Sequence, residues 1–190
     1  MTGKNIASVI IFIIALVGGR YAFKAIFAEP EIASFEESKW KQCSYEGITF
    51  DSPFELEELD VEIPFTLKAY VKEMKNFVYE SKSLTLFVSK AEYKAGIPVD
   101  IDGAIDGALS NMKRTDGVSD FTFDVQTIDK INSECRKATG NFKINENDSE
   151  FVALLHVKKS TLVQILSTNL SYDENRAIRD RIFESLDVKL

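Results

Sequence analysis

Side chains that commonly perform catalysis are scarce in this chain. His156 is its only histidine, and it lies inside the apolar run 153–157. A metal site that needs two histidines is therefore excluded within one chain. Ser44 and Ser52 have no base near them in sequence. We interpret His156 as a core or sheet-face residue and predict a protein that is not an enzyme.

Acidic residues gather in two places. Asp100 and Asp102 resemble the start of a calcium loop, but Ile105 stands where an EF-hand needs glycine and Asn111 where it needs glutamate. These acids are better explained as caps of a helix. The acids of residues 55–60 indicate a solvated acidic face, with a partner-binding loop as the alternative. We predict no metal and no cofactor.

The two cysteines, Cys43 and Cys135, lie far apart in sequence. Neither belongs to a Cys-x-x-Cys motif that would indicate metal binding or redox catalysis. In an oxidising compartment they could form a disulfide, and closing so long a loop would stabilise the fold by about 4 kcal/mol. The alternative is two buried thiols. The sequence leaves both open.

The start of the chain is apolar. Residues 6–16 are almost unbroken hydrocarbon, and residues 6–28 reach the roughly 20 residues that span a bilayer if Arg20 and Lys24 are tolerated. Cleavage as a signal peptide is disfavoured, because residues 17–19 match a peptidase site poorly and Arg20 follows at once. We predict a membrane anchor over residues 1–28.

Four residues of this segment are expected at the membrane interface. Arg20 and Lys24 lie four apart on one helical face, so both can extend to the headgroups. Tyr21 and Phe27 are aromatic side chains of the type that favours the interface. We predict one pass through the inner (cytoplasmic) membrane with the domain in the periplasm or outside. Basic residues flank the segment on both sides, so the reverse orientation stays open.

The rest of the chain is acidic. Residues 29–190 carry 20 basic and 30 acidic side chains, because the anchor contains three basic residues and no acid. This balance excludes a nucleic-acid-binding protein, which needs a basic footprint. Residues 29–42 are predicted to be a tether, and residues 43–190 have the length for one globular domain.

Two helices are predicted. Apolar residues recur at helical spacing over 101–112, with acids at the start and Gly117 beyond the end. A second helix is expected to begin with a capping box formed by Ser171 and Glu174. Its apolar stripe would contain Ile178 and Ile182. The side chains expected to face water are Arg176, Arg179 and Asp180.

Strands fill most of the remainder. Residues 75–80 and 84–93 predict one hairpin, and residues 151–157 and 161–167 predict another at the centre of a sheet. Phe121, Phe123 and Val125 alternate with polar residues, which is typical of a strand packed on one face only. Further strands are expected at 48–50 and 135–144. The fold class is therefore α+β, with a mainly antiparallel sheet of six or seven strands, one mid-chain helix and one C-terminal helix.

This order of elements is similar to the PsbP/Mog1-like α/β fold, which includes envelope proteins of the DcrB type. The resemblance is carried by residues 45–53, 138–142 and 182–186 and covers residues 43–190. Members of that fold serve as assembly factors, accessory subunits or binding adaptors, so the resemblance implies a role of this kind. Unlike its lipoprotein members, this chain has no cysteine after the apolar segment to accept a lipid.

The sequence supports two hypotheses for function. The first is a membrane-anchored, non-enzymatic envelope domain that binds a protein partner as an accessory or assembly factor. The second is a small-molecule or lipid-binding module with a pocket between the sheet and the helix at 101–112. The first is favoured by the anchor, the charge and the absence of a recognisable catalytic motif.

Overall fold

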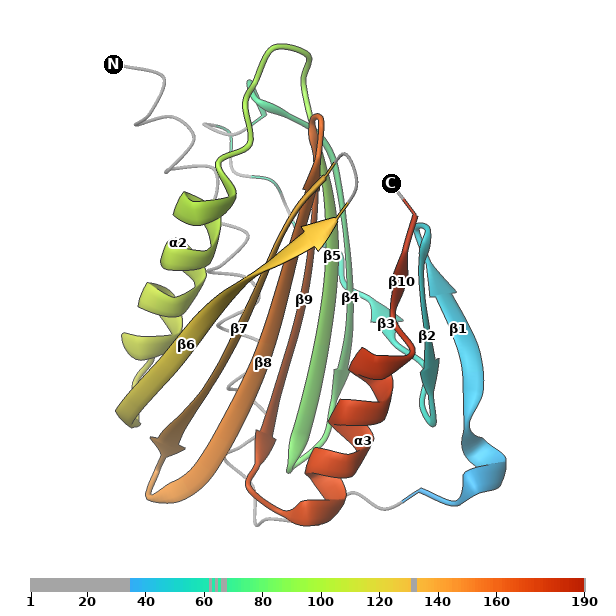
Figure 1. Cartoon of the computed structure of the whole chain (residues 1–190), viewed down its shortest axis with the longest axis vertical. Coiled ribbons are helices and arrows are strands. Elements are labelled where there is room, and N and C mark those ends of the chain that lie inside the picture. Colours follow the sequence, from blue (N-terminus) through green and yellow to red (C-terminus); the bar gives the residue numbers. More distant parts are fainter. Residues whose placement is uncertain (1–34, 62, 64, 66–67, 131–132, 190) are drawn as a thin grey trace.

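The computed structural model describes residues 35–61, 63, 65, 68–130 and 133–189 (Figure 1). The predicted anchor, with Arg20, Tyr21, Lys24 and Phe27, lies outside the described residues. None of the helices in the described part has the length and apolar character needed to cross a bilayer.

The described residues form an α+β fold with two antiparallel sheets, as the sequence predicts for the class. The larger sheet has seven strands in the order β3-β4-β5-β9-β8-β7-β6. Its strands are β3 (Glu57–Glu58), β4 (Val71–Glu80), β5 (Leu84–Tyr93), β6 (Val118–Lys130), β7 (Ser133–Ile144), β8 (Asn147–Lys158) and β9 (Thr161–Leu170). Both predicted hairpins are confirmed, and β9 lies at the centre of the sheet.

A second sheet of three strands was not predicted. Its order is β1-β2-β10, formed by β1 (Lys41–Tyr45), β2 (Ile48–Ser52) and β10 (Asp187–Val188). β1 and β2 make a tight hairpin, because Glu46 and Gly47 both adopt positive φ angles. β10 then pairs with β2 through Asp187 and Thr49, so the two ends of the described chain meet.

Helix α2 (Ile101–Lys113) confirms the first predicted helix and covers one face of the large sheet. Asp100 caps it, with Oδ1 accepting a hydrogen bond from Gly103 N at 3.0 Å. Ile105, Leu109 and Met112 are at most 3 % exposed, in a core with the large sheet's aromatic side chains. Burial of this apolar stripe, rather than helix propensity, fixes α2 on the sheet.

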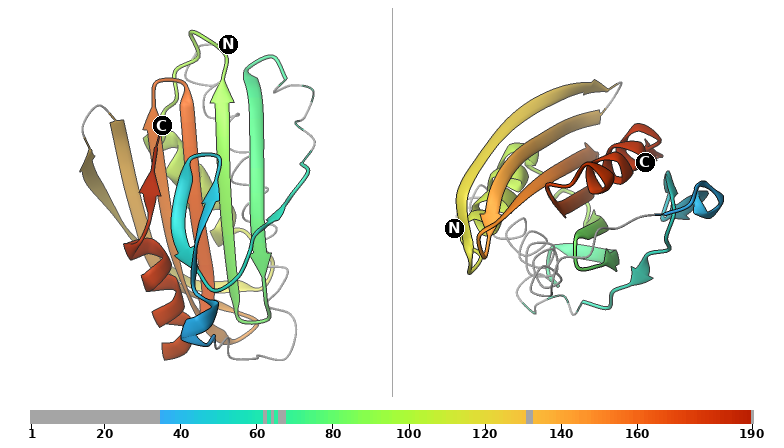
Figure 2. Two further views of the ribbon diagram at one scale, coloured as in Figure 1. Left: turned by 90° about the vertical axis from the view of Figure 1, so that its right-hand side faces the viewer. Right: turned by 90° about the horizontal axis from the view of Figure 1, so that it is seen from below.

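Helix α3 (Asp173–Glu184) covers the opposite face together with the small sheet (Figure 2). Ile178 and Ile182 are buried as predicted. The capping box is wrong, because α3 has Tyr172 as its N-cap and no side chain caps it. The Ser171 backbone N–H instead donates to the carbonyl of Asp148 at 3.0 Å, one residue beyond the end of β9.

Strand β6 is one edge of the large sheet, and its predicted packed face is only partly covered. Phe121 stacks on Phe151 with ring centroids 5.4 Å apart, whereas Phe123 and Val125 remain 53 % and 37 % exposed. An irregularity in the β6–β7 pairing follows Ser119. There the β6 backbone approaches Gly140 so closely that a Cβ on it would lie 2.1 Å from the Thr122 carbonyl oxygen.

Residues 35–42, from the segment predicted to be a tether, pack on the globular domain. Phe35 contacts Phe54 with ring centroids 5.6 Å apart. Glu37 accepts two hydrogen bonds from Arg181 of α3, at 2.6 and 2.8 Å. The same guanidinium lies 3.9 Å above the Trp40 ring. The ordered domain therefore includes contacts that begin at Phe35.

Candidate functional site

Cys135 and His156 lie opposite each other on neighbouring strands. They are register partners of the antiparallel pair β7–β8, so their side chains project from the same face of the sheet. This face also carries α3. Both residues line a cavity of about 330 Å³ between the sheet and the segment that links α3 to β10. We call this cavity the Cys135 pocket.

Basic and apolar side chains share the Cys135 pocket. Lys137 follows Cys135 by two residues and Lys158 follows His156 by two, so both lysines project from the same face as the pair. Asp187 also lines the pocket, and its Oδ2 lies 3.5 Å from Lys189 Nζ. The other residues that line the pocket are Ile128, Ser133, Leu154, Phe183, Leu186 and Val188.

A second hollow of about 370 Å³ lies next to the Cys135 pocket. On β7, Lys137 lines the first and Thr139 the second, and on β8 the corresponding residues are Leu154 and Val152. On α3, Phe183 lines the first and Arg179 the second, one helical turn apart. The two hollows therefore lie end to end between α3 and the outer strands. We call them together the α3 groove.

The ends of the α3 groove differ in charge. Among the residues that line the Cys135 pocket, Lys137 and Lys158 outnumber the single acid Asp187. In the second hollow, Arg176 and Arg179 compensate the Glu150 carboxylate, so Asp124 is the acid that has no ion pair among the described residues. The exposed Phe123 lies at the margin of the second hollow. One end of the groove thus favours an anion and the other favours a cation.

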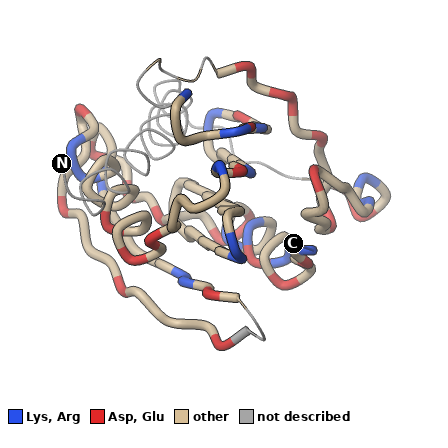
Figure 3. The backbone as a smooth tube through the Cα atoms, turned by 90° about the horizontal axis from the view of Figure 1, so that it is seen from above, with Lys and Arg blue, Asp and Glu red and all other residues tan. Residues whose placement is uncertain are grey.

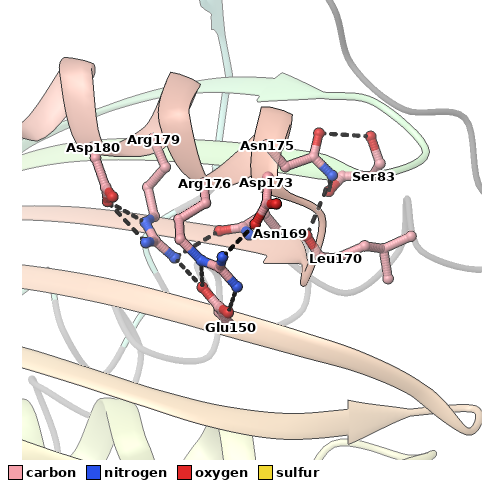
Figure 4. Close-up of polar contacts among 9 residues, drawn as sticks. All are labelled: Ser83, Glu150, Asn169, Leu170, Asp173, Asn175, Arg176, Arg179 and Asp180. Atoms are coloured by element: carbon pink, nitrogen blue, oxygen red, sulfur yellow. Dashed lines mark hydrogen bonds and ion pairs between the residues drawn. The ribbon is translucent and has the colours of Figure 1, made fainter.

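Buried polar contacts fix α3, and with it one wall of the groove (Figure 4). Arg179 donates to Glu150 Oε2 at 2.8 Å and to Asn169 Oδ1 at 3.2 Å. Arg176 holds the same carboxylate with two hydrogen bonds, at 2.5 and 3.1 Å. The expectation that Arg179 faces water is therefore wrong. Its side chain is only 8 % exposed, because it reaches over the sheet to Glu150 on β8.

The guanidinium groups change the acidity of Glu150. Hydrogen bonding from Arg176, opposed by partial burial and supported by Arg179, lowers the pKa of the Glu150 carboxyl from 4.5 to about 2. At the start of α3, Asn175 is fully buried and donates to the backbone carbonyls of Ser83 and Leu170, both at 3.3 Å. The Arg176 and Arg179 contacts hold the middle of α3 to β8, and the Asn175 contacts hold its first turn.

The two cysteines do not form the disulfide considered above. Both are buried thiols in the described structure. Cys43 belongs to β1 of the small sheet, where burial among apolar side chains raises the pKa of its thiol. Cys135 belongs to β7 of the large sheet and lines the Cys135 pocket. The two side chains therefore belong to different sheets: Cys43 packs among the apolar residues beneath the small sheet, and Cys135 faces the pocket.

The ligand pocket predicted between the sheet and the mid-chain helix stays a prediction. Among the described residues, α2 and the sheet share an apolar core at that interface. The Cys135 pocket lies on the other face of the sheet, beside α3.

The acids at 55–60 form exposed contacts with lysines: Glu55 with Lys41, and Glu58 with Lys75 at 2.8 Å. They fit the prediction of a solvated acidic face.

Sequence reasoning did not bring Cys135 and His156 together, although a signal was present. Asn145 and Glu146 form a two-residue turn with positive φ angles, which places Ile144 opposite Asn147. Counting back along both strands from this turn puts Cys135 opposite His156. Four polar residues, 145–148, stand at this point in the sequence, and the register can be counted only once the two central residues of the turn are known.

Charges elsewhere are mixed. Basic and acidic positions are interspersed along the backbone (Figure 3). In the part of the chain that the structure describes, no three His, Cys, Asp or Glu side chains are grouped in a way that could hold a metal ion.

Comparison with known proteins gives only distant structural neighbours. No protein-family model and no curated protein matches the chain. The crystal structure of the protein of unknown function PA94 from Pseudomonas aeruginosa is 8 % identical, with a TM-score of 0.43, covering 80 % of this chain and 98 % of that one. An uncharacterized Mycobacterium smegmatis protein is 13 % identical, with a TM-score of 0.35, covering 87 % and 90 %. Both TM-scores are too low to support an argument about family or function, so the PsbP/Mog1-like resemblance stays a prediction.

Proposed function

We propose that this chain is a non-enzymatic, protein-binding accessory domain that holds an extended segment of a partner in the α3 groove. The observation that carries the proposal is the end-to-end placement of two hollows, one lined by Lys137 and Lys158 and the other by Asp124. From Cys135 to Asn141 the groove follows six residue steps of β7, or about 20 Å. A segment of roughly six extended residues has this length.

The chemistry of the partner segment follows from the groove. It carries an anionic group at the Cys135 pocket, an apolar side chain against Phe183, and a basic residue near Asp124. The mixed polar and apolar lining suits a peptide, which presents backbone polar groups between side chains. The resemblance to accessory and adaptor proteins implies the same kind of role.

A peptide library tests this proposal on the full-length chain purified in detergent. Peptides of six to eight residues that are retained should carry a basic residue at one end and an anionic group at the other. Lys137→Gln and Asp124→Asn should each weaken their binding. The matched controls Lys113→Gln and Asp106→Asn, on the exposed side of α2, should not. Equal binding by all four variants would place the site elsewhere.

We also propose that residues 1–28 anchor the domain in the inner membrane, with the domain in the periplasm or outside. The proposal is supported by the apolar run 6–16 and by the two basic residues that follow it. Reporter fusions at the C-terminus, one active only in the cytoplasm and one only outside it, measure the orientation. Activity of the cytoplasmic reporter alone would contradict the proposal.

A small-molecule or lipid ligand is the second candidate function. The Cys135 pocket has about 330 Å³, at the lower end of the range for ligand sites. Native mass spectrometry of the full-length chain measures any ligand that is retained from the cell. A bound mass that disappears in the Lys137→Gln variant would favour this candidate over a peptide.

A further inference from the structure

The two lysines of the Cys135 pocket lie on either side of the pair formed by Cys135 and His156. Lys137 is one step along the sheet face in one direction and Lys158 one step in the other, each roughly 7 Å away along its strand. Each flexible side chain is long enough to reach toward an anion placed over the pair. Two ammonium groups with an imidazole between them match an anion that accepts several hydrogen bonds.

The acid in the pocket does not remove this preference. Asp187 lies within 3.5 Å of Lys189, so its charge is opposed by a cation outside the pocket lining. Among the described residues, Lys137 forms no ion pair, and its side chain is half-buried at the pocket. The pocket lining therefore carries one cation, Lys137, that has no ion pair among the described residues, in a chain whose net charge is −7.

Apolar groups surround the same cations. Phe183 and Leu186 belong to the wall formed by α3 and the segment after it, and Leu154 belongs to the sheet. A ligand that fits has a carboxylate directly beside an apolar group. The last residue of a polypeptide has this combination when its side chain is apolar, because its backbone ends in a carboxylate.

We propose that the Cys135 pocket binds the free C-terminal carboxylate of the partner segment, with the last side chain packed against Phe183 and Leu186. This inference rests on the proposed function and adds a direction to it. The segment ends at the Cys135 pocket, and its basic residue lies four or five positions earlier, near Asp124. A segment from the interior of a partner does not present the same group.

The test compares two forms of one peptide set with the full-length chain in detergent. Synthetic hexapeptides with lysine at the first position and leucine at the last are made with either a carboxylate or a carboxamide C-terminus. Fluorescence polarisation measures the affinity of each form. We expect the carboxylate form to bind about 10-fold to 100-fold more tightly, as for loss of a charge-assisted hydrogen bond. Lys137→Gln should reduce this ratio, and Lys113→Gln should preserve it.

The outcomes separate the two proposals. Equal affinity for the carboxylate and the carboxamide, with binding still weakened by Asp124→Asn, would overturn carboxylate recognition and retain the groove as a peptide site. Failure of every peptide in both forms would overturn the proposed function as well. Octanoate provides a third arm, because it has the same carboxylate beside an apolar chain but no peptide backbone. Binding of octanoate with no binding of peptides would assign the pocket to small carboxylates.

Discussion

Replacing Glu150 with glutamine tests whether the buried contacts of α3 hold the groove in place. Glu150→Gln keeps the shape of the side chain and removes its negative charge. Arg179 would then keep Asn169 and the half-exposed Asp180 as partners, but would lose the carboxylate that lies 2.8 Å from its guanidinium. A buried cation would be left with only partial compensation.

The expected cost follows from the burial of Arg179. Breaking a buried ion pair by removing one partner costs roughly 3–5 kcal/mol, and we expect the lower end because Asp180 remains. For a domain of this size, about 3 kcal/mol corresponds to a fall in Tm of roughly 6–12 °C. Urea unfolding followed by circular dichroism measures the free energy of unfolding directly.

A double-mutant cycle isolates the pair. Arg179→Met alone should also destabilise, because Glu150 loses a buried partner, while the double variant should be more stable than the sum of the two changes predicts. Glu58→Gln is the control, because it breaks an exposed ion pair with Lys75 and should leave Tm within error. A loss below about 1 kcal/mol for Glu150→Gln, or strict additivity in the cycle, would refute this reasoning.

Three other predictions concern acid stability, thiols and one glycine. The lowered pKa of Glu150 stabilises the fold fully above its ordinary value of 4.5, and this contribution is lost as the pH falls towards 2. The fall in the free energy of unfolding over that range should therefore be smaller in Glu150→Gln than in the wild type, although the variant is less stable at neutral pH. Without reductant, denatured protein should take up two iodoacetamide groups, one each on Cys43 and Cys135; uptake of none would indicate a disulfide. In the folded protein Cys43 should react slowly, because burial raises its thiol pKa. Gly140→Ala should lower the free energy of unfolding by about 1–3 kcal/mol, because the added methyl overlaps the Thr122 carbonyl oxygen, and an unchanged urea midpoint would contradict the close approach.

Elements that depend on neighbouring residues could be predicted from the sequence. The helix at 101–112 and the hairpin formed by β8 and β9 both follow from apolar periodicity and turn residues a few positions apart. Their bounds in the structure are Ile101–Lys113, Asn147–Lys158 and Thr161–Leu170. Local patterns were sufficient because each element packs an apolar face that its own sequence defines.

Elements that depend on distant partners could not be predicted in this way. β10 has only two residues and exists because it pairs with β2, whose sequence position is more than 130 residues earlier. Arg179 has the spacing of a solvent-facing residue, yet Glu150 lies 29 residues away on β8 and draws it into the interface. Periodicity contains no information about such a partner.

The α3 groove depends both on local sequence and on contacts between distant elements. The register of β7 and β8 is set by a short turn and places Cys135 beside His156, which a local argument could have found. The wall formed by Phe183 and Leu186 depends instead on where α3 docks. A search for catalytic or metal motifs overlooks such a site, because its chemistry comes from lysines, a thiol and an imidazole on separate elements.

The contact between Trp40 and Arg181 has a mechanical consequence. Any pull on the chain before Phe35 would be resisted first where Phe35 contacts Phe54, and next at the Glu37 carboxylate and the Trp40 ring, both of which hold Arg181 on α3. Phe183 is two residues further along the same helix and lines the Cys135 pocket. Load applied at the leading end would therefore reach the wall of the groove before the β1–β2 hairpin begins to open.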